Sequence, residues 1–299
     1  MYLFSLHPQK QWAQKLAKKS GLKSGRLNIK QFTDQEYYIQ VLEKVTNQEV
    51  FVLSQIGPPA DNLVKTLILL NALKSNGAKK IFVIIPFFSY SKQDRVDQPG
   101  APVSAKLMAD LLKTAGADKI ISADIHSPLT RKYIGRRLVE IQTMPLLAQY
   151  FKNKKISDLT ILSLDTGSIK RAKQFARLLK TPSVARAKKH RPKPEVAKIL
   201  KIKGNLEGKN VIIVDDFIET GGTMTAVVEM LKKIGVKNIF AAVSHGILAG
   251  PAVKNIKRSP IKKLVLTDSI PLPPEKRLDK IEVLSVIDLI SQQVNNLKK

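Results

Sequence analysis

Two adjacent carboxylates followed by a turn of small residues form the segment of this chain best suited to chemistry. Residues 211–214 read Val-Ile-Ile-Val, which predicts a buried strand, and Asp215 and Asp216 follow directly. Gly221 and Gly222 come next, before a stretch with helical periodicity. Backbone N–H groups at the start of such a helix bind phosphate groups, and two carboxylates accept hydrogen bonds from vicinal sugar hydroxyls. The segment therefore indicates a sugar-phosphate site.

Hydroxyl side chains flank the two glycines. Thr220 and Thr223 would add hydrogen bonds to a bound phosphate, and Glu219 precedes them. An alternative is an ordinary turn between a strand and a helix, with polar capping residues and no ligand. The acidic pair favours the ligand site, and the chain has neither a Gly-x-x-x-x-Gly-Lys-Ser/Thr nor a Gly-x-Gly-x-x-Gly motif.

Polar clusters also follow other apolar runs. Residues 87–95 follow one run, 124–126 end a second, and 165–171 follow a third. Each has a simple structural explanation when taken alone, such as a helix cap for Asp165 or a buried hydrogen-bonded histidine for His126. Because parallel strands bring their carboxyl ends to one edge of a sheet, such clusters are expected to converge on one cleft.

The elements that would position these residues alternate along the chain. Apolar runs predict strands at 50–53, 81–88, 120–125, 159–164, 211–214, 239–243, 264–266 and 283–286. Three- and four-residue spacing predicts helices at 61–75, 104–115, 144–151, 168–180 and 223–235. The alternation indicates an α/β fold with mostly parallel sheets flanked by helices. Residues 185–195, dense in charge and with two prolines, are expected to form an exposed loop.

Composition narrows the class of protein. The 299 residues are 43% hydrophobic, include no cysteine and carry a formal charge of +27. Disulfides and thiolate metal sites are thereby excluded. The N-terminal residues lack the layout of a signal peptide and the run 81–88 is too short for a membrane span, so we expect a cytoplasmic enzyme with no membrane partner. The lysines are scattered, so we expect no nucleic-acid partner, although the charge would attract anionic substrates.

Several motifs resemble those of the ribose-phosphate pyrophosphokinases, also called phosphoribosyl pyrophosphate synthetases. The motifs are Tyr-Ser-Lys-Gln-Asp-Arg at 90–95, Asp-Ile-His at 124–126, Asp-Asp-Phe-Ile-Glu-Thr-Gly-Gly-Thr at 215–223, Ser-His-Gly-Ile-Leu-Ala-Gly-Pro-Ala at 244–252 and Ile-Pro-Leu-Pro-Pro-Glu-Lys at 270–276. They are spread over nearly the whole chain. The resemblance implies transfer of a diphosphoryl group from Mg-ATP to ribose 5-phosphate, which releases AMP and serves nucleotide and amino-acid biosynthesis.

The resemblance also implies two tandem type-I phosphoribosyltransferase-like domains. Residues 1–143, joined by the last helix at 287–299, would form the ATP side. Residues 144–286 would carry the ribose 5-phosphate loop. Members of the family act as oligomers, so a homo-oligomer of at least two subunits is expected, with Phe32 stacking on adenine bound by a neighbouring subunit.

Site residues follow by position from the resemblance. Catalytic roles fall on Lys189 and Arg191. The residues assigned to ATP are Phe32, Asp34, Gln35, Glu36, Lys92, Gln93 and Asp97. Those assigned to ribose 5-phosphate are Arg191, Asp215, Asp216, Glu219, Thr220, Gly221, Gly222 and Thr223. Magnesium is the expected cofactor, at His126, Asp165 and Asp124.

Three positions depart from the family pattern. Lys92 stands where an arginine is usual, which keeps the charge but loses the planar guanidinium. Glu219 replaces an aspartate. The turn 166–168 has one glycine fewer than is common, which would restrict close approach of the backbone to a diphosphate.

Two other hypotheses remain open at this point. The chain would be a non-catalytic regulatory homologue of such a synthetase if the departures abolish turnover. It would be a phosphoribosyltransferase that joins a base to an activated sugar if only the 215–223 loop matters, although such an enzyme has no use for the segment 90–97. The chain also lacks the C-terminal tail of members inhibited by ADP, so we expect no allosteric inhibition by ADP.

Overall fold

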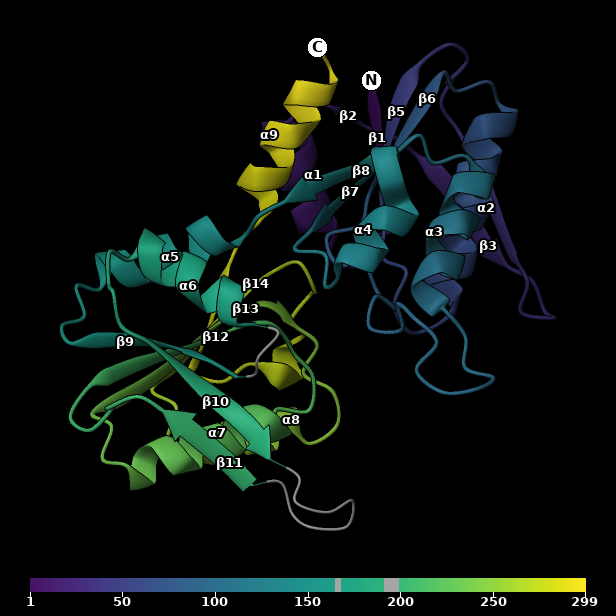
Figure 1. The fold of residues 1–299 in the computed structure, drawn as a ribbon. Helices are drawn as coiled ribbons and strands as arrows, with labels where there is room; N and C mark the ends of the chain where they lie inside the picture. The colour runs from purple at the N-terminus through teal and green to yellow at the C-terminus, as the bar shows by residue number, and fades with distance from the viewer. Residues whose placement is uncertain (165–167, 191–198) are drawn as a thin grey trace. The chain divides into compact units, whose positions relative to one another are not determined.

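The computed structural model describes residues 1–164, 168–190 and 199–299. These residues form two compact units, one made of Met1–Gln142 with Val286–Lys299 and the other of Thr143–Ser285. The chain leaves the first unit once and returns to it with its last helix, α9 (Ile287–Leu297), yellow in Figure 1. Each unit has its own sheet and its own core.

The first unit is built on a parallel sheet of six strands in the order β2-β1-β5-β6-β7-β8. The strands are β1 (Tyr2–Ser5), β2 (Lys23–Ser24), β5 (Glu49–Leu53), β6 (Lys80–Ile84), β7 (Lys119–Ala123) and β8 (Leu138–Ile141). With α9, its helices are α1 (Lys10–Lys19), α2 (Asp61–Ser75), α3 (Ser104–Ala115), α4 (Pro128–Ile134) and the 3-10 turn η1 (Gly135–Arg137).

Alternate residues of the interior strand β5 contribute to opposite faces of this sheet. Val50 and Val52 belong to the buried cluster that includes Leu69 of α2. Phe51 instead stacks on Phe82, with ring centroids 4.8 Å apart. Successive side chains of a strand point to opposite faces, so both faces are packed. Among the helices, α1 packs on α9 and α2 packs on α3, and both pairs lie side by side in Figure 1.

A two-stranded antiparallel hairpin lies outside the main sheet of this unit. It consists of β3 (Leu27–Gln31) and β4 (Tyr37–Val41), with Gln31 opposite Tyr37 next to the turn. The Tyr37 hydroxyl donates a hydrogen bond of 2.9 Å to Asp61 Oδ2 at the start of α2. The Lys65 ammonium lies 5.1 Å from the centre of the Tyr37 ring. These contacts fasten the turn end of the hairpin to α2.

The second unit contains seven strands in the order β11-β10-β9-β12-β13-β14-β15. They are β9 (Leu159–Ser163), β10 (Val184–His190), β11 (Ile199–Lys203), β12 (Asn210–Ile218), β13 (Asn238–Gly246), β14 (Lys263–Thr267) and β15 (Ile281–Leu284). All neighbours are parallel except the β10–β11 pair. The helices are α5 (Met144–Asn153), α6 (Ile169–Leu178), α7 (Gly222–Lys233), α8 (Ala252–Arg258) and the 3-10 turn η2 (Pro274–Lys276).

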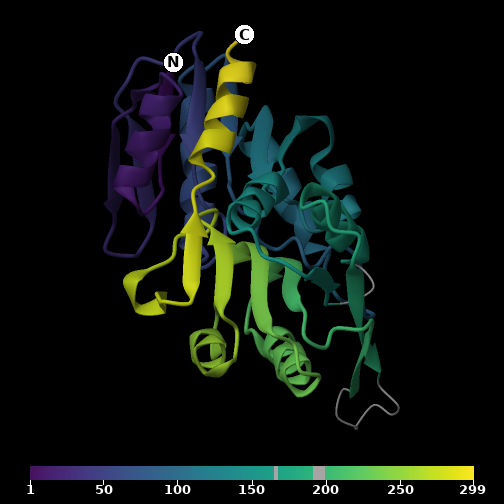
Figure 2. The ribbon, with the colours of Figure 1, turned by 90° about the vertical axis from the view of Figure 1, so that its left-hand side faces the viewer.

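Helices cover both faces of this second sheet, as Figures 1 and 2 show. Ile213 of β12 belongs to a cluster with Leu231 of α7, whereas its neighbour Ile212 belongs to a cluster with Phe175 of α6. The central strand is therefore buried on both sides, which explains its continuous apolar sequence. The prediction of an α/β fold with mostly parallel sheets is confirmed.

Some predicted elements differ from those observed. The strand expected at 81–88 ends at Ile84, shortly before Pro86, which has no N–H group to donate to a sheet. The exposed loop expected at 185–195 is wrong for its first part, because residues up to His190 form β10. Ala185 and Ala187 alternate with charged residues and are buried, so the segment pairs with its neighbours despite its charge. Residues 191–195 lie outside the described residues.

Candidate functional site

The turn between β12 and α7 places small residues at the start of a helix. Gly221 has φ +72°, a left-handed conformation that glycine adopts without strain, and α7 begins at the next residue. Thr220 Oγ1 accepts a hydrogen bond of 3.5 Å from the Gly222 N–H group. Asn255 of α8 donates 3.0 Å to the Thr220 carbonyl, which fixes the turn against the rest of the unit. The sequence-predicted phosphate loop therefore has the geometry of a helix N-terminus.

The acidic pair lies within β12, because the strand continues beyond the predicted end at Val214 to Ile218. Asp216 is buried, and its Oδ1 accepts a 3.1 Å hydrogen bond from the Phe217 N–H group. Its own N–H group donates 3.0 Å to Asp215 Oδ1. The backbone N–H groups of Asp216 and Phe217 thus hold the two carboxyl groups in fixed positions.

The two carboxyl groups differ in their electrostatic surroundings. Burial raises the pKa of Asp215 well above its ordinary value, and the charge of Asp216 and a hydrogen bond between the two side chains raise it further. Arg171 lies 3.2 Å from Asp216 Oδ2, and its positive charge opposes the rise in the pKa of Asp215 without cancelling it. The pKa of Asp215 is therefore raised, and Asp216 is the carboxyl group that contacts the arginine. A protonated carboxyl group donates a hydrogen bond and an ionised one accepts, and neighbouring sugar hydroxyls offer partners for both.

Arg171 was not predicted as a functional residue. It is the third residue of α6, and its side chain is 22% exposed where it meets the 8% exposed side chain of Asp216. The signal in the sequence was its place shortly after Ser168, near the start of a predicted helix. The neighbouring lysines Lys170 and Lys173 instead favoured the interpretation of a solvated basic helix face.

The second unit holds the predicted catalytic residues on β10 and beyond. Lys189 lies in β10, where it is paired with Leu200 of β11. Arg191 and Asp165 lie outside the described residues, as do Thr166 and Gly167. Ser168, the last residue of the segment predicted to be a turn, is described, and its hydroxyl is 2.7 Å from Ser163 Oγ.

The first unit places Asp124 and His126 directly after β7. Asp124 is buried and has φ +37°, whereas the side chain of His126 is exposed. The described residues include no group of three or more histidine, cysteine, aspartate or glutamate side chains close enough to hold a metal ion. Magnesium is commonly held by one or two carboxylates together with waters and substrate phosphates. The chemistry of the Asp124 carboxylate suits such a partial site, and the exposed imidazole of His126 is two residues further along the chain.

The segment predicted to contact a nucleotide lies between β6 and α3. Lys92, Gln93 and Asp97 are exposed. Gln93 Oε1 accepts a 2.7 Å hydrogen bond from Ser104, and its carbonyl accepts 3.0 Å from the Ala105 N–H group. The start of α3 therefore fixes Gln93.

The turn of the β3–β4 hairpin carries the other residues assigned to ATP. Phe32 is 50% exposed, with its ring centroid 6.3 Å from that of Tyr38. Its N–H group donates 2.8 Å to the Glu36 carbonyl, while Asp34 Oδ1 accepts 3.2 Å from the Glu36 N–H group. Gln35 has φ +72°. The structure thus brings Phe32, Asp34, Gln35 and Glu36 together on one exposed turn.

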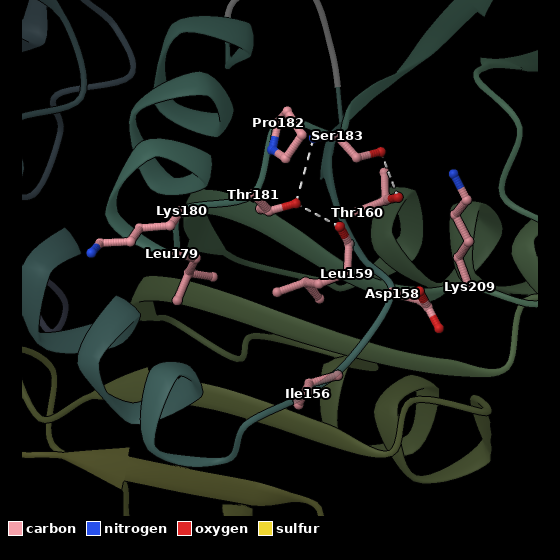
Figure 3. A pocket seen from close by; sticks show the side chains of 10 residues that line it. All are labelled: Ile156, Asp158, Leu159, Thr160, Leu179, Lys180, Thr181, Pro182, Ser183 and Lys209. Atoms are coloured by element: carbon pink, nitrogen blue, oxygen red, sulfur yellow. Dashed lines mark hydrogen bonds between the residues drawn. The ribbon is translucent and has the colours of Figure 1, made fainter.

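A cavity of about 410 Å³ lies at the amino ends of the strands of the second sheet, near the starts of β9, β10 and β12 (Figure 3). The β12–α7 turn lies at the opposite, carboxyl ends of the strands. It is lined by Ile156, Asp158, Leu159, Thr160, Leu179, Lys180, Thr181, Pro182, Ser183 and Lys209. Thr160 and Ser183 pair their hydroxyls at 2.8 Å, and Thr181 donates 2.8 Å to the Leu159 carbonyl. The hydroxyls are thus engaged with the protein, and none of the predicted site residues lines the cavity. In parallel α/β sheets ligands bind at the carboxyl ends of the strands, so this cavity is not the active site.

Comparison with known proteins identifies the family. A family model described as the N-terminal domain of ribose phosphate pyrophosphokinase matches residues 1–116, and a phosphoribosyl transferase domain matches residues 132–271. A ribose-phosphate pyrophosphokinase from Bacillus caldolyticus is 38% identical over 296 residues, which cover 99% of this chain and 94% of the relative. The chain belongs to the ribose-phosphate pyrophosphokinase family. Another relative of this name, from Oceanobacillus iheyensis, is 39% identical over 293 residues, covering 98% of this chain and 92% of the relative.

A solved structure supports the same assignment. The crystal structure of phosphoribosylpyrophosphate synthetase from Mycobacterium smegmatis superposes with a TM-score of 0.93 at 29% identity, covering 99% of this chain and 98% of that one. The prediction of two phosphoribosyltransferase-like domains is confirmed. No helix in the described part of the chain has the length and apolar character needed to cross a membrane.

Proposed function

We propose that the protein is a ribose-phosphate diphosphokinase. It transfers the diphosphoryl group of Mg-ATP to the anomeric hydroxyl of ribose 5-phosphate, which yields phosphoribosyl pyrophosphate and AMP for nucleotide and amino-acid biosynthesis. The observation that carries this proposal is the similarity over almost the whole chain to relatives of that name. The fixed acidic pair before the α7 N-terminus supports it, because those groups suit a phosphorylated sugar.

The reaction requires an in-line displacement at the β-phosphorus of ATP. The anomeric hydroxyl oxygen forms a bond to that phosphorus and releases its proton. The bond from the β-phosphorus to the oxygen that bridges to the α-phosphorus breaks, and AMP leaves with this oxygen. Holding two polyanions in that alignment is the main catalytic task, because such reactions depend on positioning and on neutralising charge.

The second unit supplies the sugar-phosphate side. Asp215 and Asp216 orient the ribose hydroxyls. Gly221, Gly222 and the hydroxyls of Thr220 and Thr223 bind the 5-phosphate at the start of α7, which lowers the cost of the negative charge. Glu219 is exposed next to this turn, and its side chain is one methylene longer than that of the aspartate usual in the family.

The first unit supplies the nucleotide side. Asp124 and His126 would hold magnesium, which when bound neutralises charge on the phosphates of ATP. Lys92, Gln93 and Asp97 contact the nucleotide. The hairpin turn offers an exposed aromatic ring in Phe32, which suits stacking on adenine. We propose that the ring serves a neighbouring subunit, so the active protein is a homo-oligomer, with Asp34, Gln35 and Glu36 lining the base.

Lys189 and Arg191 complete the proposed catalytic machinery. Both are cationic: Lys189 lies in β10, and Arg191 comes directly after the last residue of that strand in the sequence. Their role would be to stabilise the charge that develops on the transferred group and on the leaving AMP. Arg191 would also contact ribose 5-phosphate. Asp165, which lies outside the described residues, stays a predicted magnesium ligand.

A labelling experiment tests the proposed reaction. ATP that carries ³²P in its γ-phosphate is incubated with ribose 5-phosphate, Mg²⁺ and protein, and the products are separated. The proposal expects the label in a sugar diphosphate. Label in inorganic phosphate or in a ribose bisphosphate would contradict it. The alternative of a non-catalytic regulatory homologue gains no support from the comparisons. For such a homologue, all of the label would remain in ATP.

A further inference from the structure

The carboxylate of Glu140, in β8, binds two partners, the Arg131 side chain and the Ile125 N–H group. Its carboxylate forms a two-pronged ion pair with Arg131 of α4: Nε donates 2.7 Å to Oε2 and Nη2 donates 2.7 Å to Oε1. The same Oε1 accepts a 2.9 Å hydrogen bond from the Ile125 N–H group. Both oxygens are therefore engaged, and Glu140 acts as an anchor between α4 and the turn after β7.

Ile125, whose N–H group Glu140 binds, lies between the two residues that the proposed function assigns to magnesium. Asp124 precedes Ile125 and His126 follows it. A two-pronged arginine–carboxylate contact fixes the direction of both planar groups more strictly than a single contact does. The position of the Ile125 N–H group, and with it the direction of the chain from Asp124 to His126, is thereby set by Glu140.

The backbone at Asp124 needs such support. Its φ of +37° lies in the left-handed region, which residues other than glycine rarely adopt. Strained residues persist where the surrounding contacts determine their conformation. Two contacts do so here, because the Asp124 N–H group donates 3.0 Å to the Ile141 carbonyl and the next N–H group binds Glu140. Both acceptors belong to β8, which is the edge strand of the sheet.

An ordinary structural ion pair in the same unit provides a contrast. Glu49 of β5 pairs with Lys80 of β6 at 2.8 Å, and its side chain is 17% exposed, as is that of Glu140. Within the described residues, the Glu49 carboxylate accepts no hydrogen bond from a backbone N–H group of a turn. The two glutamates thus share burial and charge, and they differ in that only Glu140 fixes the Asp124–His126 turn.

We propose that Arg131 and Glu140 are positioning residues for the magnesium and nucleotide phosphates bound at Asp124 and His126. Arg131 orients Glu140 and balances its charge, and Glu140 holds the turn in its strained conformation. Neither touches the substrate. This inference rests on the proposed function. It adds Arg131 and Glu140 to the residues of the site, and both act through the backbone of Ile125.

Three variants test the proposal. Glu140→Ala removes the acceptor, Glu140→Gln keeps an oxygen for the Ile125 N–H group but loses the charge, and Glu49→Ala is the matched control. Hydrogen–deuterium exchange of the full protein reports protection of the Ile125 amide. Binding of Mn²⁺ in the presence of ATP and without ribose 5-phosphate, followed by EPR, reports the site without turnover. Product formation at varied free Mg²⁺ gives the half-saturating concentration.

The expected results separate the variants. Glu140→Ala exchanges the Ile125 amide faster and weakens Mn²⁺ binding by about tenfold, the usual size of losing a group that orients a metal ligand. The half-saturating Mg²⁺ concentration rises to a similar extent. Glu140→Gln lies between Glu140→Ala and the unmodified protein, and Glu49→Ala leaves all three measurements unchanged.

Two results would overturn the proposal. Unchanged exchange at Ile125 in Glu140→Ala would mean that the carboxylate does not hold the turn. Faster exchange with unchanged Mn²⁺ binding would mean that the contact between Glu140 and Ile125 has only a structural role. If the unmodified protein forms no phosphoribosyl pyrophosphate, the proposed function fails, while exchange and Mn²⁺ binding still decide the role of Glu140.

Discussion

Arg171 and Asp216 form an ion pair of 3.2 Å that joins α6 to the strand carrying the acidic pair. The two side chains are largely buried, and the other carboxylate oxygen of Asp216 is held by the Phe217 N–H group. Of the two adjacent carboxyl groups, Asp216 is therefore the one held by the arginine, and the Arg171 charge also opposes the rise in the pKa of Asp215. This relationship links α6 to the proposed sugar site.

Replacing Arg171 by Ala should weaken ribose 5-phosphate binding. Without the arginine, Asp216 is no longer held in one orientation, which should raise KM for ribose 5-phosphate by about tenfold, or about 1.4 kcal/mol. Losing the charge-assisted contact with a buried carboxylate should lower the free energy of unfolding by about 2 kcal/mol. Steady-state kinetics and urea unfolding measure the two effects. Arg177→Ala, at an exposed position in the last turn of the same helix, is the control and should change neither.

The raised pKa of Asp215 predicts a dependence of stability on pH. Because the folded protein holds this proton more tightly than the unfolded chain, whose aspartates titrate near the ordinary value of 3.8, the folded state binds more protons above that pH. This group's contribution to stability therefore falls as pH rises from about 4 through the raised pKa.

Asp215→Asn mimics the protonated carboxyl, so it should flatten that part of the profile and raise the free energy of unfolding at pH 8. Urea unfolding at several pH values between 4 and 8 provides the measurement. A variant with the same pH profile as the unmodified protein would show that Asp215 is not the group responsible. Asp216→Asn should instead destabilise the protein, because it leaves Arg171 without its carboxylate partner.

Phe32→Ala tests the proposed adenine contact. The ring is half exposed, so the free energy of unfolding should change by less than about 0.5 kcal/mol. Loss of ring stacking should raise KM for ATP by about fivefold and leave KM for ribose 5-phosphate unchanged. Ile29→Ala is the control, since Ile29 is 44% exposed on the same hairpin. Equal effects of both variants on KM for ATP would contradict a specific role for Phe32.

Lys189→Ala tests the proposed transition-state role. Removing one positive group that acts on developing charge should lower kcat by about a hundredfold or more. The melting temperature should change little. Lys173→Ala, at an exposed lysine of α6, controls for loss of a positive charge from the strongly basic chain. A kcat for Lys189→Ala that matches this control would remove Lys189 from the catalytic residues.

The sequence predicted the buried elements well because their signals are local. The apolar run at 211–214 and the helix that follows depend on the alternation and periodicity of neighbouring residues. The hairpin of β3 and β4 was not predicted, since its strands are short, largely exposed and mixed in composition. The segment after Val184 was predicted as a loop because its charge outweighed the alternation of Ala185 and Ala187.

In the candidate site, too, features encoded by neighbouring residues were predicted and features that depend on packing were not. The Asp215–Thr223 turn is contiguous in sequence, so its chemistry could be predicted directly. The pairing of Arg171 with Asp216, and of Glu140 with Ile125, joins residues on different elements and follows only from the packing of those elements. The strain at Asp124 likewise arises from contacts with β8 that no local pattern encodes.

Phosphorus NMR of the reaction mixture tests the central claim most directly. The protein is mixed with Mg-ATP and ribose 5-phosphate, and the signals of AMP and of a sugar-linked diphosphate are followed over time. The account predicts that both appear in equal amounts as ATP disappears. Formation of ADP would mean transfer of a single phosphoryl group, and ATP that stays intact would mean that the protein is not this enzyme; either result would contradict the account.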